Sequence, residues 1–162
     1  MTEHDVIRQL VGWHHNCYWD PTAVLAVPNT VSVLPGKWES DLLVLQPSGL
    51  LYEIEVKVSV EDFHREFKTK AKKHEALVAG FVLFRRKRQQ TRVSKFYFAM
   101  PDNVYERVKE SIPEYAGVFV IGRYPKPYKI KEARLLPTEK ARDEERNAML
   151  LCAYYKLWKR PK

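Results

Sequence analysis

The stretch WESDLLVLQPSGLLYEIEVKVS, residues 38–59, has the pattern of two strands joined by a tight turn. Pro47 suits the first central position of a type I turn. Gly49 suits the left-handed position that follows the two central residues of that turn. Together they are typical of a three-residue hairpin loop. Gln46 then faces Leu50 across the loop. A two-residue loop would shift the pairing by one residue and turn one strand's side chains to the other face. The type of turn therefore determines which residues meet.

Counted away from this loop, Asp41 faces Glu55, and Glu39 faces Lys57. Directly opposed residues share a face with Cβ atoms roughly 4.5–5.5 Å apart, and opposed like charges destabilise a sheet. A hard divalent cation such as Mg²⁺ relieves this repulsion, because it binds through one or two carboxylates and keeps several waters. Lys57 lies on the same face by the two-residue alternation of a strand. The pattern predicts a metal site with a lysine at its edge.

The composition is that of an ordinary soluble protein. The chain has 162 residues, of which 45% are hydrophobic and 30% charged, and these values favour one folded domain over residues 1–162. No stretch approaches the roughly 18–20 apolar residues of a membrane span, and the first ten residues lack a signal-peptide pattern. Two cysteines, Cys17 and Cys152, do not make a disulfide framework. We therefore expect a cytoplasmic protein without a membrane partner.

The positive charge is concentrated in one segment. Between Lys57 and Lys95 the chain has 12 Lys and Arg against 4 Asp and Glu, which accounts for the whole net charge of +8. A basic segment beside an acidic site suggests a polyanionic partner such as DNA. The alternative is a solvated helix face followed by an exposed basic loop.

The hydrophobic periodicity predicts an alternation of helices and strands. Ser59 is the expected N-cap of the helix after the hairpin, and Thr138 that of the last helix. We expect the segment 81–84 to be a strand and the segment 85–92 an exposed loop. The other expected helices are 3–13, 60–78, 102–110 and 139–158, and the other expected strands are 23–27, 38–46, 50–58, 95–100, 116–122 and, at an edge, 127–136. This order predicts an α/β fold with a central mixed sheet flanked by helices.

The motif of Asp41 followed, after a hairpin, by Glu55-Val56-Lys57 resembles the PD-(D/E)XK nuclease superfamily, with its restriction-endonuclease-like core. Further along, the strings EIEVKVSVEDF, KTKAKKHE, FYFAMPDNV and PEYAGVFVI are similar to the phage and bacterial proteins of the MmcB-type DNA-repair family. The similarity covers roughly residues 28 to 122. Ser40 precedes Asp41, where the superfamily's name has Pro.

The resemblance implies Asp41, Glu55 and the backbone carbonyl of Val56 as ligands of Mg²⁺ or Mn²⁺. It also implies that Lys57 orients or activates the attacking water. Such an ion polarises the phosphoryl oxygen and lowers the pKa of its bound water, and an ammonium stabilises the charge that develops. Further acids that could join the site are Glu3, Glu39 and Glu53.

Basic residues on the following helix and loop are candidates for contact with the DNA backbone. Lys68 or Lys72 could complete the site, and Lys70, Lys73 and His74 could extend a phosphate track. An ordinary soluble helix face is an equal alternative for each. The arginine forks of the loop suit phosphates. The residues expected to bind DNA are Lys68, Lys72, Arg85, Arg86, Lys87 and Arg88.

These observations lead to one main hypothesis, a metal-dependent DNA endonuclease-like protein of phage or bacterial DNA repair or recombination. The first alternative is a non-catalytic DNA-binding module that keeps the nuclease fold. A protein-interaction factor is a third reading, with no support beyond the basic surface. A homodimer is left open, because many enzymes of the superfamily that the chain resembles are dimers.

Overall fold

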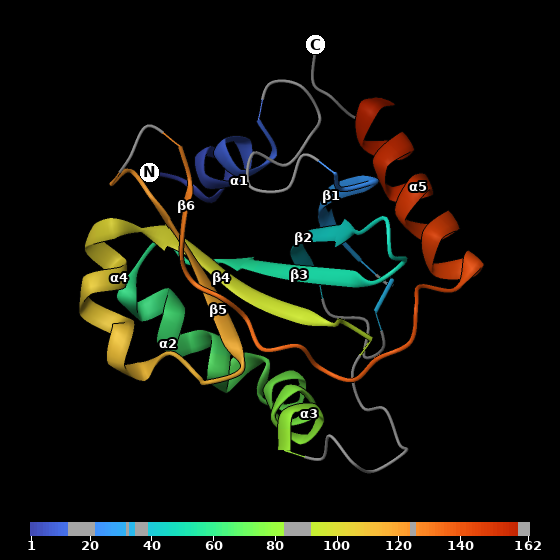
Figure 1. Ribbon diagram of the computed structural model, residues 1–162. Coiled ribbons are helices and arrows are strands. Elements are labelled where there is room, and N and C mark those ends of the chain that lie inside the picture. The colour runs from blue at the N-terminus through green and yellow to red at the C-terminus, as the bar shows by residue number, and fades with distance from the viewer. Residues whose placement is uncertain (13–21, 32, 35–38, 83–91, 124–125, 159–162) are drawn as a thin grey trace.

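The computed structural model describes residues 1–12, 22–31, 33–34, 39–82, 92–123 and 126–158. They form an α/β fold around one six-stranded mixed sheet (Figure 1). The sheet has the order of the chain itself, from β1 to β6, and β3, β4 and β5 are parallel while the other neighbours are antiparallel. The strands are β1 (Leu25–Thr30), β2 (Ser40–Leu45), β3 (Leu51–Val56), β4 (Lys95–Pro101), β5 (Ala116–Ile121) and β6 (Tyr128–Lys131). The predicted fold class is confirmed.

The β2–β3 hairpin has the predicted loop and register. The amide of Gln46 donates to the carbonyl of Leu50 at 2.9 Å, and Gly49 has a φ of 84°, in the left-handed region. Leu42 pairs with Ile54 further along the ladder, as the three-residue loop requires. The side chains of this hairpin therefore point to the faces of the sheet that were predicted from the sequence.

Helices cover both faces of the sheet (Figure 1). On one face, α1 (Glu3–Val11) packs its buried side chains against even-numbered residues of β2 and β3, such as Leu42 and Ile54. The other face is covered by α2 (Val60–Thr69), α3 (Ala71–Val82) and α4 (Asp102–Val108), followed by a 3₁₀ turn (Lys109–Ser111). The last helix, α5 (Asp143–Trp158), lies along the edge strand β1.

The single helix expected over 60–78 is two helices. Ser59 caps α2 as predicted, and its hydroxyl accepts a hydrogen bond from the amide of Asp62 at 3.1 Å. The backbone then breaks at Lys70, where φ is −114° and ψ is 33°. The strand expected at 81–84 is wrong for Phe81 and Val82, which continue α3; residues 83–84 lie outside the described part. A glycine inside a helix costs only about 1 kcal/mol, so Gly80 does not end α3.

The last helix begins at Asp143, so the predicted N-cap at Thr138 is wrong. The preceding segment is held in an irregular course by two backbone hydrogen bonds, from Leu136 to Ser94 and from Ala141 to Gly49. The carboxylate of Glu145 then accepts from the amide of Arg142 at 2.7 Å, which satisfies a free donor at the helix start. Tertiary contacts therefore determine where α5 begins, in place of the N-cap that local propensity indicated.

Within the part of the chain that the structure describes, no helix is both long and apolar enough to cross a bilayer.

Candidate functional site

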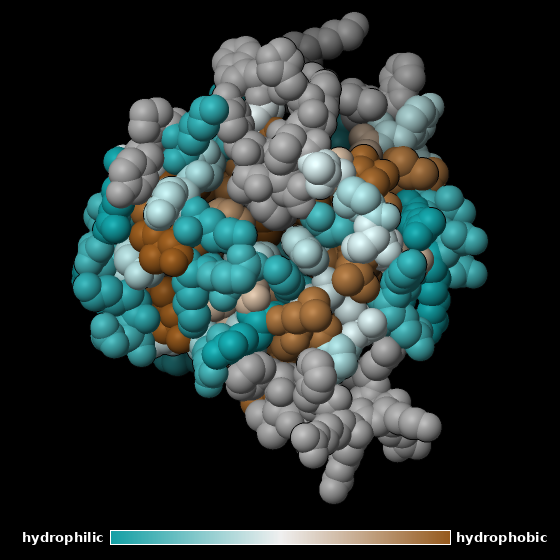
Figure 2. Space-filling model, viewed as in Figure 1, coloured by the Kyte–Doolittle hydropathy of each residue, from teal (hydrophilic) through white to brown (hydrophobic). Residues whose placement is uncertain are grey.

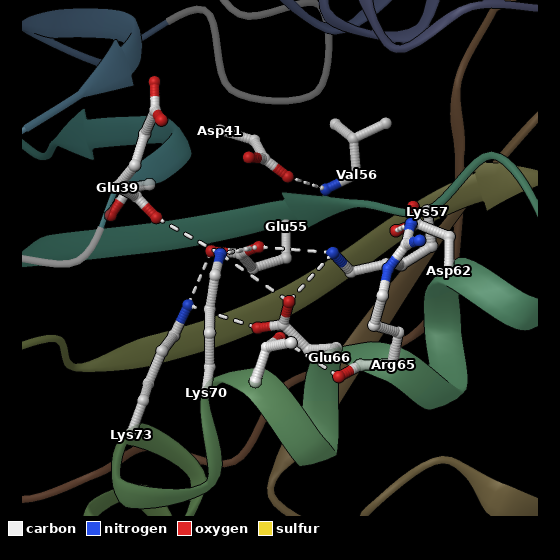
Figure 3. A network of polar contacts seen from close by, with 12 residues as sticks. Glu39, Asp41, Glu55, Val56, Lys57, Asp62, Arg65, Glu66, Lys70 and Lys73 are labelled. Atoms are coloured by element: carbon white, nitrogen blue, oxygen red, sulfur yellow. Dashed lines mark hydrogen bonds and ion pairs between the residues drawn. The ribbon is translucent and has the colours of Figure 1, made fainter.

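The acidic residues of β3 point into a buried cluster of charges between the sheet and the α2–α3 pair (Figure 3). Glu53 and Glu55 lie two residues apart on β3 and so share a face, and Lys57 follows at the same spacing. The side chain of Glu55 is 0% exposed, and those of Glu53 and Lys57 are also buried. Burying charges is unfavourable unless they are paired, so their partners determine what the site can do.

Three lysines surround Glu55. Its Oε1 accepts from the ammonium of Lys73 at 2.5 Å, and its Oε2 accepts from that of Lys70 at 2.7 Å. The ammonium of Lys57 lies 3.4 Å from the same Oε2. Lys73 is buried at 2% exposure, whereas the side chain of Lys70 is 23% exposed and lies at the rim. Both oxygens of Glu55 thus have cationic partners.

Glu66 of α2 closes the other side of the cluster. Its Oε2 lies 2.9 Å from the ammonium of Lys57, and its Oε1 lies 3.2 Å from Nε2 of His74. Nδ1 of His74 is hydrogen-bonded to the hydroxyl of Tyr115 at 2.6 Å. Burial raises the pKa of Glu66, but the hydrogen bond from His74 and the neighbouring lysines outweigh burial, so its pKa is well below the ordinary value.

Glu53 shares Lys73 with Glu55. Its Oε1 lies 2.9 Å from the Lys73 ammonium and accepts a hydrogen bond from the hydroxyl of Ser40 at 2.6 Å. Ser40 stands where the superfamily's name has Pro, and in this chain it serves as a donor inside the cluster. Glu53 therefore belongs to the cluster, as a partner of Lys73.

Asp41 lies at the point where the β2–β3 ladder ends. The antiparallel pattern would direct the amide of Val56 to the carbonyl of Ser40. Instead this amide donates to Oδ2 of Asp41 at 2.7 Å (Figure 3). Burial, followed by repulsion from the Glu55 charge, raises the pKa of Asp41 to about 8. The two acids predicted to face each other are therefore close enough to repel, but each also has its own protein partner.

The lysines keep their protons. Burial lowers the pKa of Lys57, but the charges of Glu55 and Glu66 outweigh burial, and its pKa lies above the ordinary value. The same balance holds for Lys73, whose pKa is raised by Glu53, Glu55 and Glu66 against the effect of burial. Both side chains are thus ammonium ions at neutral pH.

Four other predicted residues lie outside the cluster. Glu3 is exposed on α1, which covers the opposite face of the sheet, and it stands in the acidic first turn of that helix. The carboxylate of Glu39 is exposed and points away, while its backbone carbonyl accepts from Lys70 at 3.3 Å (Figure 3). Lys68 and Lys72 are exposed on the outer side of α2 and α3. Neither Glu3 nor Glu39 therefore directs its carboxylate into the cluster in this structure.

The arginine-rich run expected to bind DNA, Arg85, Arg86, Lys87 and Arg88, lies outside the described residues.

Sequence reasoning missed the roles of Glu66, Lys70 and Lys73 as partners of the strand acids. The signal for Glu66 was present, because it stands three residues after buried Phe63, on the apolar side of α2. The signal for Lys70 and Lys73 was present too, because they follow Phe63 at i+7 and i+10, on the same helix face as Glu66, whereas Lys72 falls on another side.

The donor set near Asp41 fits Mg²⁺ or Mn²⁺ in kind. Mg²⁺ is typically held by one or two protein carboxylates and several waters. Asp41 and Glu55 supply two such groups from neighbouring strands, and a divalent cation would favour the ionised form of Asp41. Access to Glu55 requires its most exposed lysine, Lys70, to move aside. Over the described ranges, no group of three or more His, Cys, Asp or Glu is arranged to hold a metal, so water would complete the coordination.

The raised pKa of Asp41 predicts a pH-dependent effect of Asp41→Asn on stability. Between its ordinary value of 3.8 and about 8, folded Asp41 keeps a proton that the unfolded chain releases. The free energy of unfolding of the wild type therefore falls as pH rises through this range. Asn cannot ionise and can still accept from Val56, so the variant should gain stability over the wild type as pH rises.

Thermal unfolding of both proteins in EDTA, from about pH 5 to about pH 8, measures this effect. The difference in Tm should be small at the acid end and grow toward the alkaline end. Parallel pH curves for the two proteins would show that Asp41 titrates normally.

Comparisons with known proteins support the fold and give no information about the activity. No family model matches the chain, and no curated protein sequence matches it. A solved structure, described as SPO1766 protein of unknown function from Silicibacter pomeroyi, matches with a TM-score of 0.52 and 18% sequence identity. The match covers 84% of this chain and 75% of that one. This protein therefore shares its overall fold with the Silicibacter pomeroyi protein.

Proposed function

We propose that this protein is a metal-dependent DNA nuclease of the PD-(D/E)XK type, acting in phage or bacterial DNA repair or recombination. The observation that carries the proposal is the arrangement around the end of β3. Asp41 and Glu55 come from neighbouring strands, burial and the Glu55 charge together raise the pKa of Asp41, and the Lys57 ammonium lies 3.4 Å from Glu55. A divalent cation bound between a buried and a half-buried carboxyl group would favour the ionised form of both.

In this proposal Asp41 and Glu55 hold Mg²⁺ or Mn²⁺, and the carbonyl of Val56 is a further ligand. When bound, the ion would supply a water of lowered pKa and polarise the phosphate to be cleaved. Lys57 stays protonated, so it donates hydrogen bonds and stabilises negative charge on the phosphate. It does not act as the base that removes a proton from water.

The exposed face of α2 and α3 suits the DNA backbone. Lys68 and Lys72 are exposed there, and Lys70 lies at the rim of the cluster beside them. The segment from Lys57 to Lys95 that contains these helices carries the whole net charge of +8, of which residues 60–82 contribute +1 and residues 83–95 contribute +6. A phosphate drawn to the rim would compete with Glu55 for Lys70, which offers a way to free Glu55 for the metal.

Cleavage of labelled duplex, single-stranded and branched DNA with Mg²⁺ or Mn²⁺ tests the proposal. We expect cleavage that requires the metal and falls at least about 100-fold in Lys57→Met, because a donor to the developing charge is lost. Lys109→Gln, an exposed lysine on the 3₁₀ turn, serves as the matched control and should cleave like the wild type. Absence of metal-dependent cleavage of all three substrates, or full activity of Lys57→Met, would defeat the catalytic claim.

One observation favours the alternative, a DNA-binding module without catalysis. Both oxygens of Glu55 already have lysine partners, so the charge that would hold the metal is neutralised inside the protein. Isothermal calorimetry with Mg²⁺ or Mn²⁺ separates the two readings. A heat of metal binding in the wild type that is absent in Asp41→Asn supports the nuclease hypothesis. Salt-dependent DNA binding with no metal binding supports the module.

A further inference from the structure

The ammonium group of Lys70 lies among oxygen atoms from three parts of the chain (Figure 3). It donates to Oε2 of Glu55 at 2.7 Å and to the backbone carbonyl of Glu39 at 3.3 Å, and Oε2 of Glu66 lies 3.6 Å away. Carboxylate and backbone carbonyl oxygens are also typical ligands of a hard divalent cation. Lys70 is thus surrounded by the same kinds of atom as a bound Mg²⁺ would be.

Lys70 is the lysine of the cluster that can leave at the lowest cost. Its side chain is 23% exposed, whereas those of Lys57 and Lys73 are 6% and 2% exposed. Lys57 and Lys73 also each pair with a second buried glutamate at 2.9 Å, and that glutamate would lose a partner if either of them left. Without Lys70, in contrast, Glu55 keeps both of the other lysines as partners.

The charges of the cluster balance without a metal ion. Over the residues that the structure describes, the lysine–glutamate pairs of the cluster join three acids and three bases, namely Glu53, Glu55, Glu66, Lys57, Lys70 and Lys73. A divalent cation added to this group would bring two uncompensated positive charges into a buried site, which is unfavourable. If Lys70 leaves and Asp41 binds the ion as a carboxylate, the group carries two negative charges, which one divalent cation balances. The charge balance therefore favours exchange of the Lys70 ammonium for the ion.

We propose that Lys70 competes with the metal ion for Glu55, and that an anion at the rim relieves this competition by drawing the Lys70 ammonium away. The inference rests on the proposed function, because it concerns the regulation of the same site. An oxyanion such as a DNA phosphate forms a charge-assisted hydrogen bond with an ammonium. Figure 2 shows a mainly hydrophilic surface on the side of the molecule where α2 and α4 lie, which suits a hydrated anion. Metal and anion then each raise the affinity of the protein for the other.

Isothermal calorimetry with Mn²⁺ tests the competition. Lys70→Gln removes the charge but keeps a hydrogen-bond donor, and it should bind Mn²⁺ at least about 5-fold more tightly than the wild type, the lower end of typical coupling between sites. Lys70→Met, which has nearly the length of Lys, should behave in the same way. Lys72→Gln makes the same change of charge on the exposed side of α3 and should bind like the wild type. Thermal unfolding gives a second measurement, because Mn²⁺ should raise the Tm of Lys70→Gln more than that of the wild type.

Sulfate serves as the probe for the effect of an anion. At constant ionic strength, replacing chloride by sulfate should tighten Mn²⁺ binding by the wild type more than by Lys70→Gln. Direct pairing of Mn²⁺ with sulfate is the same for both proteins and cancels in this comparison. A sulfate effect of equal size in the two proteins would show that the anion does not act through Lys70.

Failure of this inference and failure of the proposed function give different results. Equal Mn²⁺ affinities of Lys70→Gln and Lys72→Gln would overturn the competition and leave the proposed metal site intact. If neither the wild type nor Lys70→Gln binds Mn²⁺, the metal site itself is wrong, and the competition is wrong with it. Circular dichroism checks that each variant is folded.

Discussion

Lys73→Met is expected to destabilise the folded protein by about 3–5 kcal/mol, the range measured when one partner of a buried ion pair is removed. Met has nearly the length of Lys but no charge. Lys73 is 2% exposed and lies 2.5 Å from Glu55 and 2.9 Å from Glu53. Without its ammonium, these two buried carboxylates repel each other and lose their shared partner.

The neighbouring residue supplies the control for this prediction. Lys72→Met makes the same chemical change on the exposed side of α3, and its effect on stability should stay within about 0.5 kcal/mol. Urea unfolding at neutral pH measures both variants. A Lys73→Met protein as stable as Lys72→Met would mean that the two carboxylates find other partners.

Gly117→Ala is expected to destabilise the protein by about 1–3 kcal/mol, as overpacking of a core does. A Cβ at this position of β5 would lie 2.4 Å from the ring of Tyr97 and 2.6 Å from the backbone nitrogen of Ala133. The Tyr97 ring cannot turn aside easily, because it is buried and its hydroxyl donates to Glu132 at 2.5 Å. The backbone at Ala133 can give way only if the segment after β6 moves.

A double-mutant cycle identifies the source of this strain. Tyr97→Leu removes the ring that the new methyl group would meet, so the cost of Gly117→Ala should be smaller in that background. Denaturant unfolding of the four proteins gives the coupling energy. Equal costs in both backgrounds would assign the strain to Ala133 alone. An unchanged stability of Gly117→Ala would show that β5 and its neighbours can separate freely.

The hairpin was predictable because its information is local. Pro47 and Gly49 define the loop, the loop defines the register, and the register places Asp41 near Glu55. The same holds for the cap at Ser59, whose hydroxyl meets an amide three residues away. The fold class followed from the order of such local patterns.

The partners of the acids were not predictable in the same way. Helical spacing places Lys70 and Lys73 on the side of α2 and α3 that carries Phe63 and Glu66, but which strand acid each lysine reaches depends on how these helices pack on the sheet. The start of α5 likewise depends on Glu145, which caps Arg142 and pairs with Arg92 from a distant part of the chain. Sequence spacing carries no information about such long-range contacts, so the start of this helix was placed too early.

The hairpin, α2 and the first turn of α3 form one uninterrupted segment, residues 40–74, and every charged member of the cluster belongs to it. Loops this short close at a small entropic cost, so these charged groups can meet through local closure, while the cluster still needs Tyr115 from outside the segment as the partner of His74. Insertions or loop exchanges outside this segment that spare Tyr115 would leave the charged groups of the cluster and their order in the sequence unchanged. Residues 40–74 thus supply every charged group of the cluster from one continuous stretch of the chain.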